Sequence, residues 1–94
     1  MEIVRIEGRD KGKIMLYALS TCGWCRKTKI LLNEMGLAYS YVDVDLLQGA
    51  ERTDTLKEVQ RWNPDGSFPT MVIDDSHCVV GFKEEMIRER FAEK

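Results

Sequence analysis

The sequence predicts a single α/β domain whose elements follow the order β-α-β-α-β-β-α around a mixed four-stranded sheet. Two observations support this prediction. In the first half, an apolar strand, a helical segment and a second strand follow one another, which is the pattern of a βαβ unit with parallel strands and a right-handed crossover. In the second half, two short strands flank a turn and precede an amphipathic helix, which adds an antiparallel hairpin.

The first half supplies the βαβ unit. Residues 13–19 are a continuous apolar run, as expected for a strand buried on both faces. Residues 23–35 favour a helix, which Gly36 ends because glycine readily adopts the left-handed conformation at a helix C-terminus. Residues 38–44 predict the partner strand. Weak alternation within residues 2–7 is compatible with an additional N-terminal edge strand.

The second half begins with a helix over residues 49–62, where Leu56, Val59 and Trp62 recur at helical spacing. Residues 68–73 and 77–80 predict two strands joined by a turn at residues 74–76. Gly81 interrupts the second of these strands. The last helix then has an apolar stripe, predicted from Phe82, Met86, Ile87 and Phe91.

Length and charge limit the classes of function. With 94 residues we expect one domain, 1–94, composed of an N-terminal extension (1–12) and a core (13–91). The net charge of -2 gives no basic surface for nucleic acid. No apolar run approaches the roughly 18 residues of a membrane helix, and the N-terminus lacks the basic and apolar regions of a secretory signal. We therefore expect a cytoplasmic monomer without nucleic-acid or membrane partners.

The three cysteines, Cys22, Cys25 and Cys78, carry the strongest functional signal. An odd number of cysteines argues against a framework of structural disulfides and favours either a redox pair with one further thiol or a metal site. Cys22 and Cys25 lie where the first strand leads into a helix. Unpaired backbone N–H groups and the helix dipole at that end favour a thiolate on Cys22. Cys25 follows about one turn later, where it is better shielded and placed to resolve a mixed disulfide formed on Cys22.

A zinc site is the alternative use of the cysteines, with Cys22, Cys25, His77 and Cys78 as ligands. It is disfavoured because His77 and Cys78 are neighbours in a predicted strand and point to opposite faces. We predict no metal ligand among the site residues. Cys78 is interpreted as a small buried apolar residue, with a regulatory thiol as the alternative.

Pro69 lies at the start of a predicted strand, between Phe68 and Thr70. Proline has no N–H to donate to the ladder of a central strand, so its restriction to strand starts and edges is by itself enough to explain Pro69 at this position. A cis Phe68–Pro69 bond would in addition leave the backbone of Phe68 free to pair with an extended substrate. Asp43 and Asp45 lie at the end of the strand predicted over residues 38–44, and we expect them to be solvated there; the alternative is that they pass protons to the resolving thiol.

These landmarks give the chain a resemblance to the glutaredoxin family, of thioredoxin-like fold, over about residues 13–91. The matching features are the Cys22-Gly-Trp-Cys25 pair after a buried strand, Phe68-Pro69-Thr70, and Gly81 before the last helix. The resemblance implies that Cys22 is the nucleophile, that Pro69 is a cis-proline beside it, and that the backbone of Phe68 contacts the thiol substrate. The residues expected to bind substrate are Trp24, Phe68, Pro69, Thr70 and Gly81.

The same resemblance implies reduction of protein disulfides or of glutathione mixed disulfides, in electron transport and cell redox homeostasis. It implies glutathione as co-substrate and no tightly bound cofactor. Some members of the family instead hold an iron–sulfur cluster between the first cysteines of two subunits with added thiols, which is a further alternative.

Several positions depart from the common pattern of the family. Leu19 stands where many members have a lysine that pairs with a glutathione carboxylate, and Val80 replaces the first glycine of a Gly-Gly pair. Glu84 is placed like an aspartate that holds the glutamyl end of glutathione. Val80-Gly81-Phe82 is similar to glutaredoxin-like redoxins that are reduced by thioredoxin reductase. The reductant is therefore either glutathione or a thioredoxin-reductase-type partner.

Overall fold

The computed structural model describes residues 3–92 and confirms the α/β thioredoxin-like fold. Its sheet has five strands in the order β1-β3-β2-β4-β5, in which β2 and β3 are parallel and every other neighbouring pair is antiparallel. The strands are β1 (Val4–Ile6), β2 (Ile14–Ala18), β3 (Tyr39–Asp43), β4 (Thr70–Ile73) and β5 (His77–Val80). The additional N-terminal strand is present as β1, although Glu2 of the segment that predicted it lies outside the described residues.

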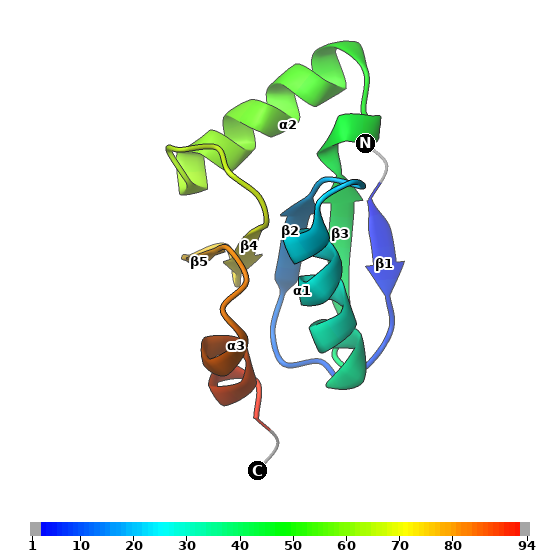
Figure 1. The fold of residues 1–94 in the computed structure, drawn as a ribbon, viewed down its shortest axis with the longest axis vertical. Coiled ribbons are helices and arrows are strands. Elements are labelled where there is room, and N and C mark those ends of the chain that lie inside the picture. The colour runs from blue at the N-terminus through cyan, green and yellow to red at the C-terminus, as the bar shows by residue number, and fades with distance from the viewer. Residues whose placement is uncertain (1–2, 93–94) are drawn as a thin grey trace.

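Three α-helices and one short 3₁₀ turn connect and cover the strands. They are α1 (Gly23–Glu34), η1 (Val44–Leu46), α2 (Gly49–Trp62) and α3 (Glu84–Arg90). In Figure 1, α1 lies in front of β2 and β3, while α2 crosses above one end of the sheet. None of the helices within residues 3–92 has the length and apolar character required to span a membrane.

The sheet separates two hydrophobic cores because successive side chains of a strand point to opposite faces. In β2, Ile14, Leu16 and Ala18 belong to the core beneath α1 and α3, whereas Met15 and Tyr17 face the core beneath α2. A strand buried on both faces requires the continuous apolar run seen in the sequence. The parallel pairing of β2 with β3 brings Ala18 opposite Asp43, so the loops after both strands meet at one edge of the sheet.

Two predicted helix stripes are partly wrong. In α2, Val59 is buried and Trp62 packs against the core, but Leu56 is 36% exposed, and its neighbour Thr55 is buried. In α3, Met86 is 39% exposed while Ile87 is 1% exposed. Adjacent residues on a helix are about 100° apart, so a small rotation decides which of two neighbours faces the sheet, and the apolar pattern alone does not fix that rotation.

The fourth strand also begins later than predicted. The sequence predicted a strand from residue 68, but β4 begins at Thr70. Pro69 has no N–H to donate to the ladder, although its carbonyl oxygen accepts from Gly81 N at 2.8 Å and so extends the pairing with β5 on one side. Phe68 and Pro69 therefore form the approach to the strand, beside the loop that carries the cysteines.

Candidate active site

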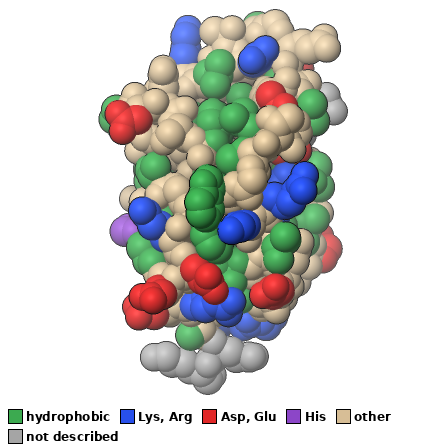
Figure 2. All heavy atoms as spheres, in the orientation of Figure 1, with side chains coloured by type: hydrophobic (Ala, Val, Ile, Leu, Met, Phe, Trp, Pro, Cys, Tyr) green, Lys and Arg blue, Asp and Glu red, His purple; other side chains and the backbone are tan. Residues whose placement is uncertain are grey.

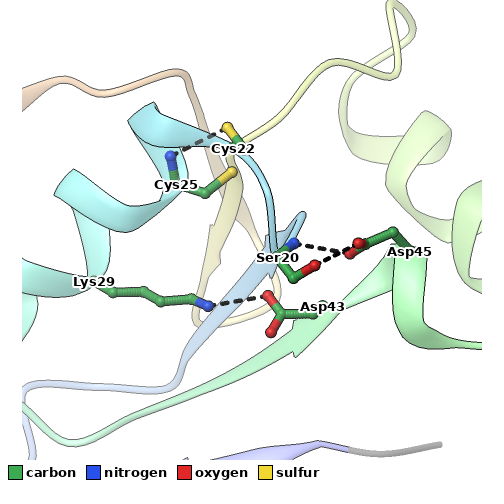
Figure 3. A network of polar contacts seen from close by, with 6 residues as sticks. All are labelled: Ser20, Cys22, Cys25, Lys29, Asp43 and Asp45. Atoms are coloured by element: carbon green, nitrogen blue, oxygen red, sulfur yellow. Dashed lines mark hydrogen bonds and ion pairs between the residues drawn. The ribbon is translucent and has the colours of Figure 1, made fainter.

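Cys22 is the N-cap of α1, and its sulfur is held by the helix it precedes. The backbone N–H of Cys25 donates to Cys22 Sγ at 3.2 Å, and Arg26 N donates to the carbonyl oxygen of Cys22 at 3.0 Å. Cys22 N in turn donates to the carbonyl of Leu19 at 3.2 Å, which closes the loop between β2 and the helix. An amide aimed at the sulfur at a helix N-terminus stabilises negative charge there. Figure 3 shows the two cysteines at this point.

The two thiols differ strongly in their surroundings. Both cysteines are free, but Cys22 is partly exposed while Cys25 is 0% exposed. Burial, followed by the hydrogen bond with Cys22, raises the pKa of Cys25 to about 12. The Leu19 backbone and the charge of Lys29 act in the opposite direction on this pKa. One sulfur is thus accessible to a substrate, and the other is a shielded thiol directly behind it.

An open hollow of about 210 Å³ lies beside the cysteine loop. It is lined by Trp24, Phe68, Pro69, Gly81 and Phe82, and the Phe68–Pro69 bond is cis. Four of the five residues expected to bind substrate therefore meet in one place. The fifth lining residue, Phe82, was predicted to belong to the apolar stripe of the last helix. Its position directly after Gly81, an expected substrate-binding residue, is the feature of the sequence that could have indicated it.

Two aromatic rings form a wall of this hollow. The centroid of the Trp24 ring lies 6.0 Å from that of Phe82, with an interplanar angle of 26°, and the Trp24 side chain is 58% exposed. Lys27 Nζ sits 4.7 Å from the Trp24 centroid, in a cation–π contact. Figure 2 shows hydrophobic side chains gathered down the middle of the face that carries α1, with Lys and Arg side chains beside them. An exposed aromatic wall of this kind is suited to contact with a partner.

Thr70 does not line the hollow, contrary to expectation. It is 0% exposed, and its Oγ1 donates to the carbonyl of Ser67 at 2.8 Å and accepts from Asn63 Nδ2 at 3.1 Å. Asn63 Nδ2 also donates to the carbonyl of Ser67 at 3.1 Å. These bonds brace the chain between α2 and β4, so the side chain of Thr70 holds the Phe68–Pro69 segment from behind.

Asp43 is not solvated as predicted, whereas Asp45 stays close to the surface. The side chain of Asp43 is 16% exposed and its Oδ1 pairs with Lys29 Nζ at 3.0 Å (Figure 3). Asp45 accepts from Ser20 N at 2.8 Å, and its hydrogen bonds with Ser20 lower the pKa of its carboxyl group. Asp45 thus holds the loop before Cys22 through Ser20, and Asp43 holds Lys29 of α1.

The other candidate ligands do not join the cysteine pair in a metal cluster. His77 is exposed on β5 and Cys78 is half-buried there, with its pKa raised by burial. Within residues 3–92, no group of three or more His, Cys, Asp or Glu side chains is arranged to hold a metal ion.

Comparison with known proteins places this geometry in a family. A family model described as Glutaredoxin matches residues 14–78, which include both cysteines and Pro69. The chain belongs to the glutaredoxin family. Gly81 and Phe82, which also line the hollow of this glutaredoxin-family chain, lie beyond the matched segment.

Solved structures support the assignment to the glutaredoxins. Methanoredoxin from Methanosarcina acetivorans has a TM-score of 0.88 and 50% identity, over 92% of this chain and 90% of that one. The glutaredoxin from Methanosarcina mazei Go1 has a TM-score of 0.88 and 47% identity, over 97% and 88% of the two chains. A zeta-class glutathione S-transferase from Euphorbia esula is 33% identical over 89 residues. That match covers 89% of this chain but 38% of the transferase, so the chain spans little more than a third of that relative's length.

Proposed function

We propose that this glutaredoxin-family chain is a thiol–disulfide oxidoreductase that reduces protein disulfides or glutathione mixed disulfides through Cys22 and Cys25. The observation that carries the proposal is the asymmetry of the pair. Cys22 is accessible and its sulfur accepts a backbone N–H at 3.2 Å, while Cys25 is 0% exposed one turn further along α1. Thiol–disulfide exchange needs an accessible thiolate to attack and a second thiol close enough to complete the reaction.

The reaction proceeds in two exchanges. The thiolate of Cys22 attacks a substrate disulfide, forms a mixed disulfide with one substrate sulfur and releases the other as a thiolate. The sulfur of Cys25 then attacks Cys22, which forms the Cys22–Cys25 disulfide and expels the remaining substrate sulfur. Cys25 loses its thiol proton to solvent before this attack, and the substrate sulfur leaves as a thiolate, which takes up a proton from solvent. One substrate disulfide is reduced and the two cysteines are oxidised, so the electrons balance.

The hollow beside the pair is the proposed substrate site. Its lining is apolar and aromatic: the stacked rings of Trp24 and Phe82 lie in it together with Phe68 and Pro69. An extended substrate segment pairs with the backbone of Phe68 and places its disulfide near Cys22. The stacked rings support apolar parts of the substrate.

The reductant in this proposal is glutathione or a thioredoxin-reductase-type dithiol. Leu19 has an apolar side chain that packs against the core beneath α2, and it therefore offers no cation to a glutathione carboxylate. Incubation of the oxidised protein in a series of glutathione and glutathione disulfide ratios, followed by mass spectrometry, separates the two. Reduction at physiological ratios, with a glutathionyl adduct on Cys22 in Cys25→Ser, assigns glutathione. A pair that stays oxidised until a dithiol reductase is added assigns the second class.

Activity of matched cysteine variants tests the function itself. With dithiothreitol as reductant, we expect Cys22→Ser to lose disulfide reduction by at least roughly a hundredfold, because Cys25 is buried and Cys78, the other partly exposed thiol, does not line the hollow. Cys78→Ser is the matched control, since Cys78 lies on β5 and does not line the hollow. We expect it to retain activity within about twofold. Full activity of Cys22→Ser would end the assignment.

A metal-binding role for the same cysteines is the competing proposal. A zinc site within one chain needs at least three ligands, which residues 3–92 do not bring together, whereas an iron–sulfur cluster shared by two subunits needs only Cys22 from each. We expect no tightly bound cofactor. Anaerobic purification from iron-replete cells should give colourless protein, and a chelator should leave the melting temperature unchanged. Visible absorption with bound iron, or a chelator-induced drop in melting temperature, would favour an iron–sulfur or zinc site.

The biological setting completes the proposal. We propose that residues 1–94 act as one domain with residues 13–91 as its core, and as a cytoplasmic monomer in redox homeostasis. Disulfide-containing proteins are the proposed partners. Size-exclusion chromatography with light scattering tests the monomer, and a dimer mass would refute it.

A further inference from the structure

The ammonium group of Lys29 is held in place beside the cysteine pair. Its Nζ lies 3.0 Å from Asp43 Oδ1 and 4.0 Å from the centre of the Tyr41 ring, in an ion pair and a cation–π contact. The side chain of Lys29 is 22% exposed, and that of Asp43 is 16% exposed. A lysine with two partners that is largely removed from water keeps a fixed charge at a defined position.

Lys29 and the buried thiol of Cys25 lie on the same face of α1. Lys29 follows Cys25 by four residues on α1, which places the two side chains on the same face of the helix. Tyr41 and Asp43 alternate along β3 on the face that packs beneath α1. In Figure 3 the Lys29 side chain runs from α1 towards β3, beneath the turn that carries Cys25.

The charge acts on Cys25 in the direction that the second exchange needs. The positive charge of Lys29 lowers the pKa of Cys25, against the larger effect of burial. Asp43 holds the lysine but is not among the groups that shift this pKa. A charge acts more strongly in a shielded site than in water, because the local dielectric is lower. Of the two partners of this ion pair, Lys29 is therefore the one whose charge acts on Cys25.

We propose that Lys29, held by Asp43 and Tyr41, is a positioning residue that stabilises the Cys25 thiolate as it attacks the mixed disulfide on Cys22. The inference rests on the proposed function and extends it to the second exchange alone. Cys25 gives its thiol proton to solvent before it attacks. The Cys22–Cys25 bond then replaces the bond between Cys22 and the substrate sulfur, which leaves as a thiolate with the bonding electron pair. The ammonium of Lys29 keeps its own protons throughout.

A coloured disulfide separates the two exchanges in one experiment. The bis-nitrobenzoate disulfide releases one yellow thiolate when Cys22 attacks it and a second when Cys25 resolves the adduct. In stopped-flow measurements the first phase depends on reagent concentration, and the second is first order and independent of it. Cys78→Ser serves as the parent, so that only the pair reacts. Cys25→Ser in this background should release one thiolate.

Lys29→Met should slow the second phase roughly tenfold and leave the first phase within about twofold of the parent, which corresponds to a loss of about one pKa unit of stabilisation. Lys29→Arg restores the charge and should recover the second phase to within about threefold of the parent. Lys57→Met, which removes an exposed lysine of α2, is the matched control and should change neither phase. Asp43→Asn should slow the second phase by a smaller factor, since it releases the lysine without removing it.

Three results would overturn the inference: an unchanged second phase in Lys29→Met, equal slowing of both phases, or no recovery in Lys29→Arg. If Lys29→Met does not fold, the double variant Lys29→Met/Asp43→Asn leaves no unpaired buried charge and should show the same selective slowing. A parent-like second phase in that double variant overturns the inference equally. Failure of the proposed function looks different, because the parent protein itself would then release no second thiolate.

Discussion

The backbone N–H of Cys25 donates a hydrogen bond to the sulfur of Cys22 at 3.2 Å, although the two residues lie three positions apart. The residue that we propose to resolve the mixed disulfide thus also supplies, through its backbone, a donor for the sulfur proposed to attack. This works because Cys22 caps α1, where backbone N–H groups lack partners within the helix. The cap geometry links the local fold directly to the chemistry of the pair.

The second exchange should accelerate with pH. Burial raises the pKa of Cys25 to about 12, so its thiol is protonated throughout the neutral range. Below that pKa, each pH unit upwards increases the thiolate fraction, and with it the resolving rate, roughly tenfold. Stopped-flow measurement of the first-order phase between about pH 7 and about pH 9 checks this. A resolving rate that is flat over this range would contradict the assignment of Cys25 as the buried resolving thiol.

The aromatic wall should matter for substrate binding and little for stability. Trp24 is 58% exposed and its principal ring contact is with Phe82, so Trp24→Ala removes binding surface while leaving the core intact. We expect KM to rise roughly threefold to tenfold, in line with the value of an aromatic contact, with kcat little changed. Steady-state kinetics and urea unfolding measure the two effects. Leu46→Ala, which truncates another exposed apolar side chain away from the hollow, is the control. An unchanged KM in Trp24→Ala would show that the Trp24 ring does not contribute to substrate binding.

The two apolar neighbours on α3 should differ sharply in their contribution to stability. Ile87 is 1% exposed in the core beneath α1, whereas Met86 is 39% exposed. We expect Ile87→Ala to lower the free energy of unfolding by about 2–4 kcal/mol, because it leaves a cavity. Met86→Ala should change it by less than about 1 kcal/mol. Urea denaturation of both variants tests the rotation of the helix, and equal losses would show that α3 is rotated from the described orientation.

The sequence predicted the features that depend on local patterns. The apolar run of β2, the hairpin between β4 and β5, and the cysteine pair at the start of α1 are all confirmed as elements of the fold. Each follows from neighbours in the chain: an apolar run, a turn, a helix start. Pro69 was located in the same way, because proline is restricted to a few places in a sheet.

Features that depend on packing between distant segments were not predicted. Lys29 and Asp43 are 14 residues apart, and they meet because the crossover of the βαβ unit lays α1 over β3. The sequence does not show which of the basic residues near the start of α1 faces the sheet. The same limit explains Phe82, whose ring stacks on Trp24 across 58 positions of sequence, and the exposed Leu56 on α2.

Covalent trapping tests the central claim most directly. The Cys25→Ser variant is mixed with a disulfide substrate, and the adduct is located by peptide mass spectrometry without reduction. The account predicts a stable mixed disulfide on Cys22 in Cys25→Ser, none in Cys22→Ser, and only the internal Cys22–Cys25 disulfide in the parent chain. A stable adduct on Cys78, or on Cys25 in Cys22→Ser at a comparable rate, would contradict the assignment of Cys22 as attacking thiol and Cys25 as resolving thiol.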